Sequence, residues 1–186
     1  MSHYSEPDGN RRAGASLHAP EAIGLTIRDG QPLDAGAAGD ILGQSVRDHR
    51  WMPGLYSEAE NIAHVGRLID LGWVRVAVDG VVRGFLAREE GYIHALYVAR
   101  GSRGAGIGRS LIRDAMAKSD LLELHTFEAN VGARRFYRQL GFVEAERSDG
   151  RDNDEGLPDV RLVWSGAKGF GVRSQTGKMA TGGETK

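Results

Sequence analysis

The feature that most constrains the fold of this chain is a glycine- and arginine-rich turn between an apolar strand and an amphipathic helix. The predicted strand covers residues 92–98, and the turn follows at residues 100–109. One face of the next helix consists of Ile107, Leu111, Ile112, Ala115 and Met116. Backbone N–H groups in such a turn and at a helix start attract an anion, and glycine leaves them uncovered. A phosphate-bearing ligand is therefore the first expectation.

The glycine spacing excludes two common nucleotide-binding loops. A dinucleotide-binding loop needs a third glycine three residues after Gly106, and this chain has Arg109 there. A P-loop needs lysine and then serine or threonine after its last glycine, whereas Gly108 is followed by Arg109 and Ser110. The spacing that the turn does carry is R-x-x-G-x-G, from Arg103 to Gly108. Arg103 and Arg109 are placed to add charge-assisted hydrogen bonds to a phosphate.

A second motif lies downstream, where residues 130–142 have the sequence NVGARRFYRQLGF. An asparagine after a strand, followed by A-x-x-F-Y-x-x-x-G-F, is similar to one signature of the GNAT N-acetyltransferases. The R-x-x-G-x-G turn resembles the other, the loop that holds the pyrophosphate of acetyl-CoA in that family. Residues 149–164, DGRDNDEGLPDVRLVW, resemble the tail of several bacterial GNAT proteins. The resemblance spans about residues 22–165.

The resemblance implies transfer of an acetyl group from acetyl-CoA to a primary amine, by direct attack in a ternary complex. It implies that N–H groups of the turn hold the pyrophosphate and that a strand N–H near Leu96 or Val98 polarises the thioester carbonyl. Asn130 is expected to cap the next helix, to bind the pantetheine arm, or both. The residues expected at the coenzyme are Leu96, Val98, Arg103, Gly104, Ala105, Gly106, Ile107, Gly108, Arg109, Asn130, Ala133 and Tyr137.

Two residues are expected at the reacting atoms. In the family, the tyrosine at the position of Tyr137 lies beside the coenzyme sulfur, where it protonates or hydrogen-bonds the leaving thiolate. Without the resemblance, a tyrosine on a helix is more often part of the core. His94 lies on the strand that separates to admit the acetyl group, and arylalkylamine acetyltransferases carry histidines in a similar H-A-L-x-V setting. Since histidine titrates near neutral pH, His94 is expected to accept the amine proton directly or through water, the alternative being a histidine that faces the core.

An acidic segment precedes the last predicted strand. It contains Asp149, Asp152, Asp154, Glu155 and Asp159, and in this fold it can approach the acceptor side of the sheet. Glu155 and Asp159 are the candidate substrate-binding residues, because carboxylates attract and orient a cationic amine. The alternative is a solvated acidic loop.

Composition narrows the class of protein further. The chain has 186 residues, a net charge of −1 and 40% hydrophobic residues, which indicates one folded domain with no electrostatic preference for nucleic acid or a membrane. It has no cysteine, which excludes disulfides and an acyl-cysteine intermediate, and no metal site is expected. No leader or membrane-spanning segment is visible, so the cytoplasm is the expected location. The expected partner is a small-molecule amine, with a homodimer left open.

The predicted elements run strand, two helices, three strands, helix, strand, helix and two strands. This order is that of an α/β fold of the α+β type, a single GNAT-like domain whose central, mostly antiparallel mixed sheet is flanked by helices. The domain is expected at residues 22–165, between disordered tails at 1–21 and 166–186. The first strand is expected at residues 23–27, and Asp34 is expected to cap the first helix.

Two local signals mark the next elements. Ser57 and Glu60 form the pattern of a capping box at the start of the second helix. Asp79 and Gly80 predict a tight hairpin between two strands.

Two other functions stay open at this point. A non-catalytic acyl-CoA-binding sensor would keep the glycine turn yet tolerate the loss of Tyr137. A protein N-terminal acetyltransferase would differ in its acceptor alone. Because acceptor sites are built from loops, the sequence does not name the acceptor.

Overall fold

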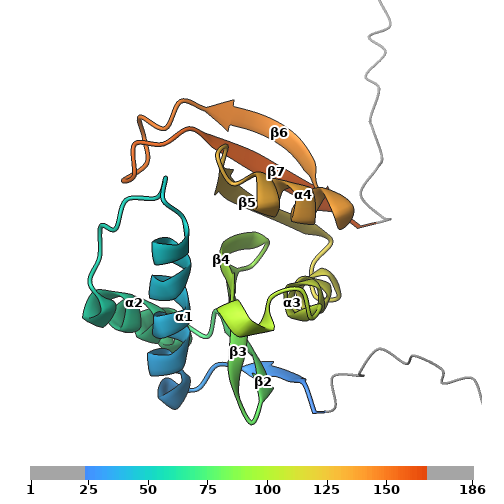
Figure 1. Ribbon diagram of the computed structural model, residues 1–186. Coiled ribbons are helices and arrows are strands. Elements are labelled where there is room, and N and C mark those ends of the chain that lie inside the picture. Colours follow the sequence, from blue (N-terminus) through green and yellow to red (C-terminus); the bar gives the residue numbers. More distant parts are fainter. Residues whose placement is uncertain (1–23, 167–186) are drawn as a thin grey trace, which may run out of the picture.

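A seven-stranded mixed sheet with strand order β1-β2-β3-β4-β5-β7-β6 runs through the molecule (Figure 1). The computed structural model describes residues 24–166, and the two predicted tails lie almost wholly outside this range. The elements, in chain order, are β1 Thr26–Asp29, a short 3-10 helix Pro32–Asp34, α1 Ala35–Asp48, α2 Glu58–Asp70, β2 Val74–Asp79, β3 Val81–Glu89, β4 Tyr92–Val98, a second 3-10 helix Arg100–Ser102, α3 Ile107–Met116, β5 Leu121–Phe127, α4 Val131–Gln139, β6 Val143–Ser148 and β7 Asp159–Ser165.

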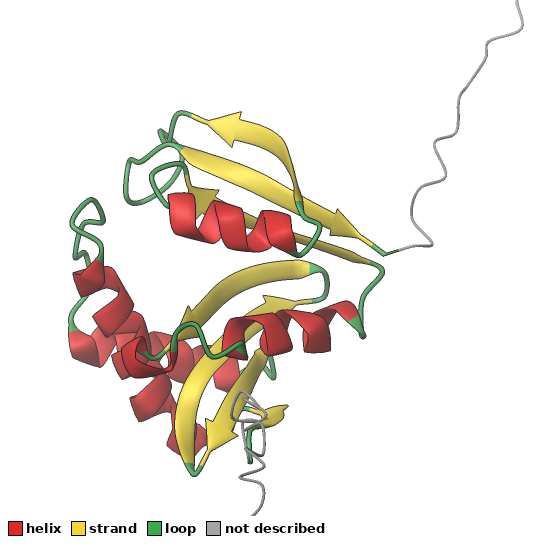
Figure 2. Ribbon diagram, turned by 45° about the vertical axis from the view of Figure 1, so that its right-hand side comes forward, coloured by secondary structure: helices red, strands yellow, loops and turns green. Residues whose placement is uncertain are grey.

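The sheet consists of two antiparallel halves that meet at one parallel contact. Strands β1 to β4 form one half, and β5, β7 and β6 form the other. Between β4 and β5, the register pairs Tyr92 with Glu123, and no further pair follows within the described residues. Figure 2 shows the two halves opening like a V beyond this point. The predicted mostly antiparallel sheet and the predicted element order are confirmed.

A β-bulge in β4 marks the start of this separation. Ala87 pairs with Ala95 but the next residue of β3, Arg88, pairs with Ile93, so His94 is the extra residue of β4. A bulge bends its strand and increases the local twist. This curvature carries the rest of β4 away from β5.

Helices cover both faces of the sheet, and each face has its own apolar core. Helices α3 and α4 lie over one face, where the buried residues include Leu86, Leu111, Leu122, Phe142 and Leu162. Helices α1 and α2 lie over the other face, where the buried residues include Val65, Val74, Val76, Phe85 and Ile69. Each large side chain buried in this way contributes about 1.5–3 kcal/mol. The sheet therefore stays rigid on both sides of the opening.

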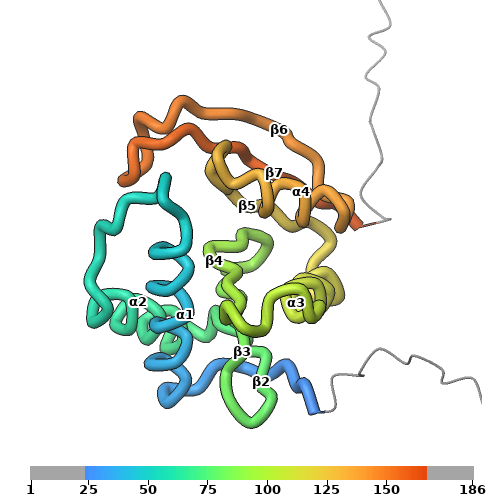
Figure 3. The backbone as a smooth tube through the Cα atoms, viewed as in Figure 1, coloured from blue at the N-terminus to red at the C-terminus, as the bar shows by residue number. Residues whose placement is uncertain are grey.

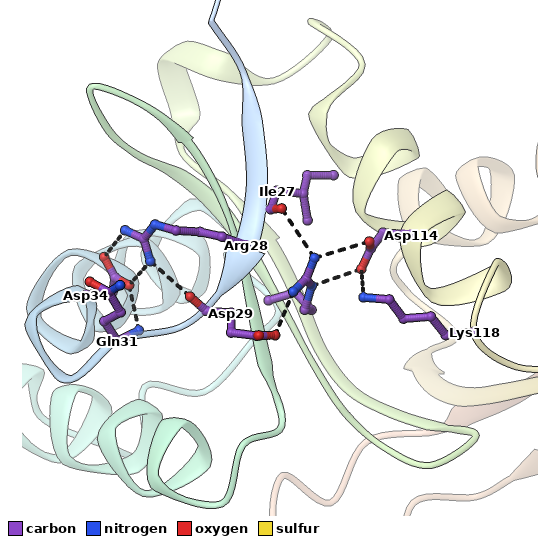
Figure 4. Close-up of polar contacts among 8 residues, drawn as sticks. Ile27, Arg28, Asp29, Gln31, Asp34, Asp114 and Lys118 are labelled. Carbon is purple, nitrogen blue, oxygen red and sulfur yellow. Dashed lines mark hydrogen bonds and ion pairs between the residues drawn. The ribbon is translucent and has the colours of Figure 1, made fainter.

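Arg75 ties the first half of the sheet to α3, the helix that follows the glycine turn. Its guanidinium contacts Asp29 of β1 at 2.6 Å and the Ile27 carbonyl oxygen at 3.2 Å. The same group contacts Asp114 near the end of α3 at 3.0 Å, and Lys118 adds a further contact to that carboxylate (Figure 4). The Arg75 side chain is only 19% exposed, so this network fixes α3 against β1 and β2.

The local sequence signals have mixed outcomes. The Ser57 and Glu60 capping box is present with both hydrogen bonds, and Gly80 turns the hairpin at a φ of +67°. Asp34 stands at the start of α1 without capping it, because its carboxylate binds Arg28 at 2.6 Å and the Gln31 N–H at 2.7 Å (Figure 4).

The first strand was predicted two to three residues too early: β1 is Thr26–Asp29, and residue 23 lies outside the described range.

Candidate functional site

Two cavities meet where β4 and β5 separate. The larger, of about 550 Å³, lies over the glycine turn and is called the coenzyme cavity below. The smaller, of about 320 Å³, lies between β4, β5 and the loop before β7 and is called the acceptor cavity below. The residues common to both walls are Ser45, His49, Leu96, Tyr97, Asn130 and Ala133. These shared walls make the two cavities one continuous space.

The glycine turn presents open backbone to the coenzyme cavity. Gly104 and Gly106 have φ angles of +81° and +84°, which disfavour any residue with a side chain. An added Cβ at either position would meet no atom within 4 Å, so the space before both is open. Gly106 stands at the start of α3, whose first N–H groups have no partner within the helix. The uncovered N–H groups and the open space before the two glycines both fit a diphosphate.

The two arginines of the turn have different surroundings. The Arg103 guanidinium contacts Asp48 at 2.8 Å and the Val98 carbonyl oxygen at 3.2 Å, and Arg100 also pairs with Asp48. Arg109 lines the cavity and has no ion pair recorded among residues 24–166. The direct phosphate contact predicted for Arg103 would therefore compete with Asp48, whereas Arg109 is placed to reach an anion.

The edge of β4 supplies the N–H groups that the sequence predicts. The Ala99 N–H donates to the Arg83 carbonyl oxygen of β3 at 2.8 Å. Since N–H groups of successive strand residues point to opposite edges, those of Val98 and Leu96 point toward the opening. Both residues line the coenzyme cavity, as do Ile107 and Gly108.

Of the remaining predicted coenzyme residues, Asn130 and Ala133 lie at the start of α4, and Tyr137 lies near its end and lines the acceptor cavity alone. The Asn130 side chain accepts a hydrogen bond from the Ala133 N–H at 3.0 Å, so it caps α4 while both residues line the two cavities. Ala105 lies in the turn but is not part of either wall. Because Gly104 and Gly106 flank Ala105, its side chain can point away from the cavity while the backbone of the turn lines it.

Tyr137 of α4 lines the acceptor cavity. Its side chain is packed at its edges by Phe136 and Phe142, and the residue is 6% exposed. Burial, together with the nearby Tyr97, raises the pKa of the Tyr137 phenol well above its usual value of 10. The phenol is therefore a firmly protonated hydrogen-bond donor at neutral pH.

Two loops lie over the acceptor cavity from opposite halves of the fold. Figure 3 shows the loop after α1 beside the loop between β6 and β7. Trp51, in the first loop, packs edge-on against Phe127 of β5 with ring centroids 5.6 Å apart. The Tyr56 hydroxyl donates to Asp154 of the second loop at 3.3 Å. The contact between Tyr56 and Asp154 thus joins two loops that are 98 residues apart in the sequence.

The acidic segment contributes two carboxylates to the acceptor cavity, Glu155 and Asp159. Asp159 accepts hydrogen bonds from Asn153 at 3.0 Å and makes a second contact with His125 at 3.2 Å, so both oxygens are engaged. Glu155 has no ion pair recorded among the described residues, and its charge raises the pKa of the nearby Tyr97, second to burial. Glu155 is therefore the better placed of the two to meet a cationic amine.

Three histidines line the acceptor cavity, His49, His94 and His125, and the Nδ1 of His49 contacts the Ser45 carbonyl oxygen at 2.7 Å. His94 is stacked on Trp73 with the rings 2° from parallel and 4.9 Å apart, and its Nε2 lies 3.7 Å from exposed Glu89. His125 of β5 faces the same cavity and contacts Asp159. His94 was predicted from the sequence, whereas His125 was interpreted as structural or surface.

Five further wall residues were not predicted as site residues from the sequence. They are Ser45, His49, Tyr92, His125 and Asn153. Four separate elements carry them, and the pairing of β5 with β7 decides that His125 and Asp159 meet. Alternation along β5 was the available signal, since buried Leu122 and Leu124 place His125 on the opposite face.

In residues 24–166, the longest helices are too short and too polar to cross a bilayer.

Comparison with known proteins gives consistent matches. The profile of the acetyltransferase (GNAT) family matches residues 44–142. The peptidyl-lysine N-acetyltransferase YjaB of Escherichia coli (strain K12) is 30% identical over 95 residues, 51% of this chain and 65% of the relative. The 5-NmdU N-acetyltransferase of Pseudomonas phage PaMx11 is 38% identical over 88 residues, 42% of this chain and 63% of the relative. The chain thus matches just under two thirds of the length of these curated relatives.

Solved structures give the same fold. The solution structure of apo YjaB from Escherichia coli superimposes with a TM-score of 0.65 at 26% identity, covering 77% of this chain and 99% of the other. Salmonella typhimurium yncA with its cofactor acetyl-CoA has a TM-score of 0.61 at 20% identity, covering 76% of this chain and 93% of the other.

Proposed function

Since the chain belongs to the acetyltransferase (GNAT) family, we propose that it transfers the acetyl group of acetyl-CoA to a primary amine by direct attack while both are bound. The observation that carries the proposal is the meeting of the two cavities at Leu96, Tyr97 and Asn130. A thioester placed there would face an amine from the acceptor cavity without leaving the coenzyme cavity. Such placement supplies the proximity that direct transfer needs.

Acetyl-CoA would supply the activated acetyl group as a thioester. The backbone from Arg103 to Arg109 would hold its pyrophosphate, with Gly104 and Gly106 allowing close approach. Asn130 and Ala133 would lie along the pantetheine arm. The N–H groups of Leu96 and Val98 point toward the opening, where they can stabilise negative charge on the thioester oxygen.

Tyr137 would donate a hydrogen bond to the leaving sulfur. Because burial raises the pKa of its phenol further above the value of about 8.5 for an ordinary thiol, full proton transfer to the thiolate is unfavourable. A hydrogen bond from a buried donor still stabilises the developing charge, typically by about 1.5–3 kcal/mol. The role of Tyr137 is thus stabilisation of the leaving group.

Glu155 supports a cationic acceptor. Glu155 lines the acceptor cavity, whose wall also contains aromatic residues such as Trp51. Such a site favours an alkylammonium group, through charge and through the ring face. Two relatives, one named for peptidyl lysine and one for 5-NmdU, indicate that the acceptor differs within the family. We therefore propose that the acceptor is a primary amine that carries a second cationic or polar group.

An acceptor panel tests this proposal. The chain would be incubated with acetyl-CoA and N-terminally blocked lysine peptides, peptides with a free N-terminus, diamines and simple alkylamines. Release of free thiol and formation of the N-acetyl product would be followed together. Turnover with blocked lysine peptides or diamines supports the proposal, and turnover with free N-termini alone indicates a protein N-terminal acetyltransferase. Coenzyme binding without any turnover indicates a non-catalytic sensor.

A further inference from the structure

We infer that His125, oriented by Asp159, is the base that takes the proton from the acceptor ammonium. This inference rests on the proposed function and deepens it, because it assigns the proton acceptor inside the acceptor cavity. It replaces His94, the candidate that the sequence offers, in that role.

The sheet register brings the two residues together. His125 of β5 stands opposite Arg161 of β7, and Asp159 lies two residues along β7 on the same face. Diagonal neighbours of this kind are within reach of side-chain contact. The distance between His125 Nδ1 and Asp159 Oδ1 is 3.2 Å. Leu122 and Leu124 are buried on the other face of β5, and His125 itself lines the acceptor cavity.

Asp159 is held firmly in its ionised form. The residue is 9% exposed, and its Oδ2 accepts a hydrogen bond from Asn153 Nδ2 at 3.0 Å. Asn153 is itself fixed by the Leu157 backbone, donating to the carbonyl oxygen at 2.8 Å and accepting from the N–H at 3.1 Å. Burial acts against ionisation, yet the hydrogen bonds from Asn153, His125 and Ser148 hold the pKa of Asp159 below its usual value.

This contact decides which imidazole nitrogen carries the proton. A carboxylate only accepts hydrogen bonds, so Nδ1 must be the N–H and Nε2 keeps its lone pair. The carboxylate also stabilises the imidazolium that forms when Nε2 takes up a proton. His125 is 42% exposed at its side chain, which leaves Nε2 accessible to a substrate or to one bridging water.

The proton and electron balance of the step is simple. The ammonium of the acceptor gives one proton to His125 Nε2, which later releases it to solvent. The freed nitrogen lone pair forms the C–N bond to the acetyl carbon, and the C–S bond breaks with its electron pair on sulfur. The second N–H proton of the amine leaves to the sulfur, near the Tyr137 hydroxyl. The products are the N-acetylamine and the free thiol.

The other charged and titratable groups near His125 are less well placed to orient its imidazole or to act as the base. Tyr92 of β4 lies 6.3 Å away between ring centroids, and Arg161 and Glu123 pair with each other at 2.9 Å. Glu155 adds negative charge from the loop before β7. His49 contacts the Ser45 carbonyl oxygen at 2.7 Å instead of a carboxylate, and His94 lies 3.7 Å from Glu89, whose side chain is 53% exposed.

The first test compares three histidine substitutions in the full chain, with acetyl-CoA and the best acceptor of the panel. His125→Gln is expected to lower kcat by about 10²-fold or more and to abolish the acidic limb of the pH–rate profile. Coenzyme affinity should stay unchanged. His94→Gln should keep that limb, whatever its rate. His64→Gln, a matched change on α2 outside both cavities, should match the parent.

The second test does not depend on activity. Nitrogen NMR of the coenzyme-free chain should show the neutral His125 ring protonated at Nδ1, and Asp159→Asn should mix the two tautomers. The Asp159→Asn variant should also lose most of the kcat that His125→Gln loses, and the double variant should add little to either, as expected of two groups acting as a unit.

The outcomes distinguish failure of the proposed acetyl transfer from failure of the role assigned to His125. If the parent binds acetyl-CoA but acetylates no amine, the proposed function fails. If the parent is active and His125→Gln retains both its acidic limb and a kcat within about threefold, this inference is overturned, since a general base contributes ~10²–10⁴. A His125 ring protonated at Nε2 in the parent would overturn it as well. Thermal melting of each variant confirms that a loss of rate is not a loss of fold.

Discussion

The coenzyme cavity and the acceptor cavity share a wall, yet they are built in opposite ways. Residues 96–109, one continuous run of strand, turn and helix, provide most of the coenzyme cavity. The acceptor cavity takes its walls from five separate stretches, at residues 45–52, 92–97, 124–127, 130–137 and 153–159. The first depends on local backbone geometry, and the second depends on strand register and on contacts between distant loops.

This difference has a consequence for how each cavity responds to change. The coenzyme cavity should lose its ligand when one glycine of the turn acquires a side chain, because the backbone N–H groups of the turn are themselves the binding groups. A cavity assembled from five separate stretches instead loses one contribution at a time when a single wall residue is changed. Substitutions should therefore separate coenzyme binding from acceptor use cleanly.

The largest effect is expected from Gly106→Glu. The new side chain fills the open space before the turn and adds negative charge, and it also strains a residue at φ +84°. Coenzyme-induced stabilisation, about 2.7 kcal/mol at a concentration 100 times Kd, should vanish. The matched control is Gly72→Glu, which has the same kind of φ, +75°, and open space away from both cavities. Thermal melting with and without acetyl-CoA gives the answer, and equal stabilisation of parent and Gly106→Glu would contradict the assignment.

Tyr137→Phe should have the next largest effect, and it acts in the wall of the acceptor cavity. It removes one hydroxyl and keeps the packed ring, so kcat should fall by about 10–100-fold while coenzyme Kd stays constant. Because burial raises the pKa of Tyr137, the phenol stays protonated across the usual assay range, and no alkaline limb should be set by it. Tyr56→Phe, in a tyrosine outside both cavities, is the control. A kcat within about twofold of the parent would make Tyr137 a core residue only.

A smaller and more selective effect is expected from Glu155→Gln. For acceptors with a second positive charge, kcat/KM should fall by about tenfold, since a hydrogen bond to a charged group is typically worth about 1.5–3 kcal/mol. Simple alkylamines and coenzyme binding should change little. Asp154→Asn, in the neighbouring carboxylate that contacts Tyr56 instead of the cavity, should leave the ranking of acceptors alone. An unchanged ranking in Glu155→Gln would assign the acidic loop to solvent.

The smallest effect is expected from removal of residues 1–21 and 168–186. Both segments lack apolar periodicity, and both cavities are lined by residues between 45 and 159. Melting temperature and coenzyme affinity should stay at the parent values. A large drop in either would show that one segment docks on the domain or on a second copy.

The same contrast explains how much could be predicted from the sequence. Gly104 and Gly106 were found because a turn of this kind needs glycine at fixed positions, and the capping role of Asn130 follows from its place before α4. The element order also follows from local periodicity, and it is confirmed.

What could not be predicted depends on contacts between distant residues. His125 and Asp159 are 34 residues apart and meet only because β5 pairs with β7 in one register. The engagement of Arg103 by Asp48 crosses 55 residues, and it changes the role expected for a loop arginine. Asp34 stands at a capping position and instead binds Arg28 of the preceding strand. In each case an ionic partner from another element competes with the local pattern.

One measurement tests the central claim, that the two cavities form a single site for acetyl transfer. Free thiol and N-acetyl product would be counted in the same reaction, with acetyl-CoA and a blocked lysine peptide or diamine, for the parent and for Gly106→Glu. The account predicts one thiol for each N-acetyl group in the parent and neither product from Gly106→Glu. Thiol release without acetylated amine, or acetylation that survives Gly106→Glu, would contradict it.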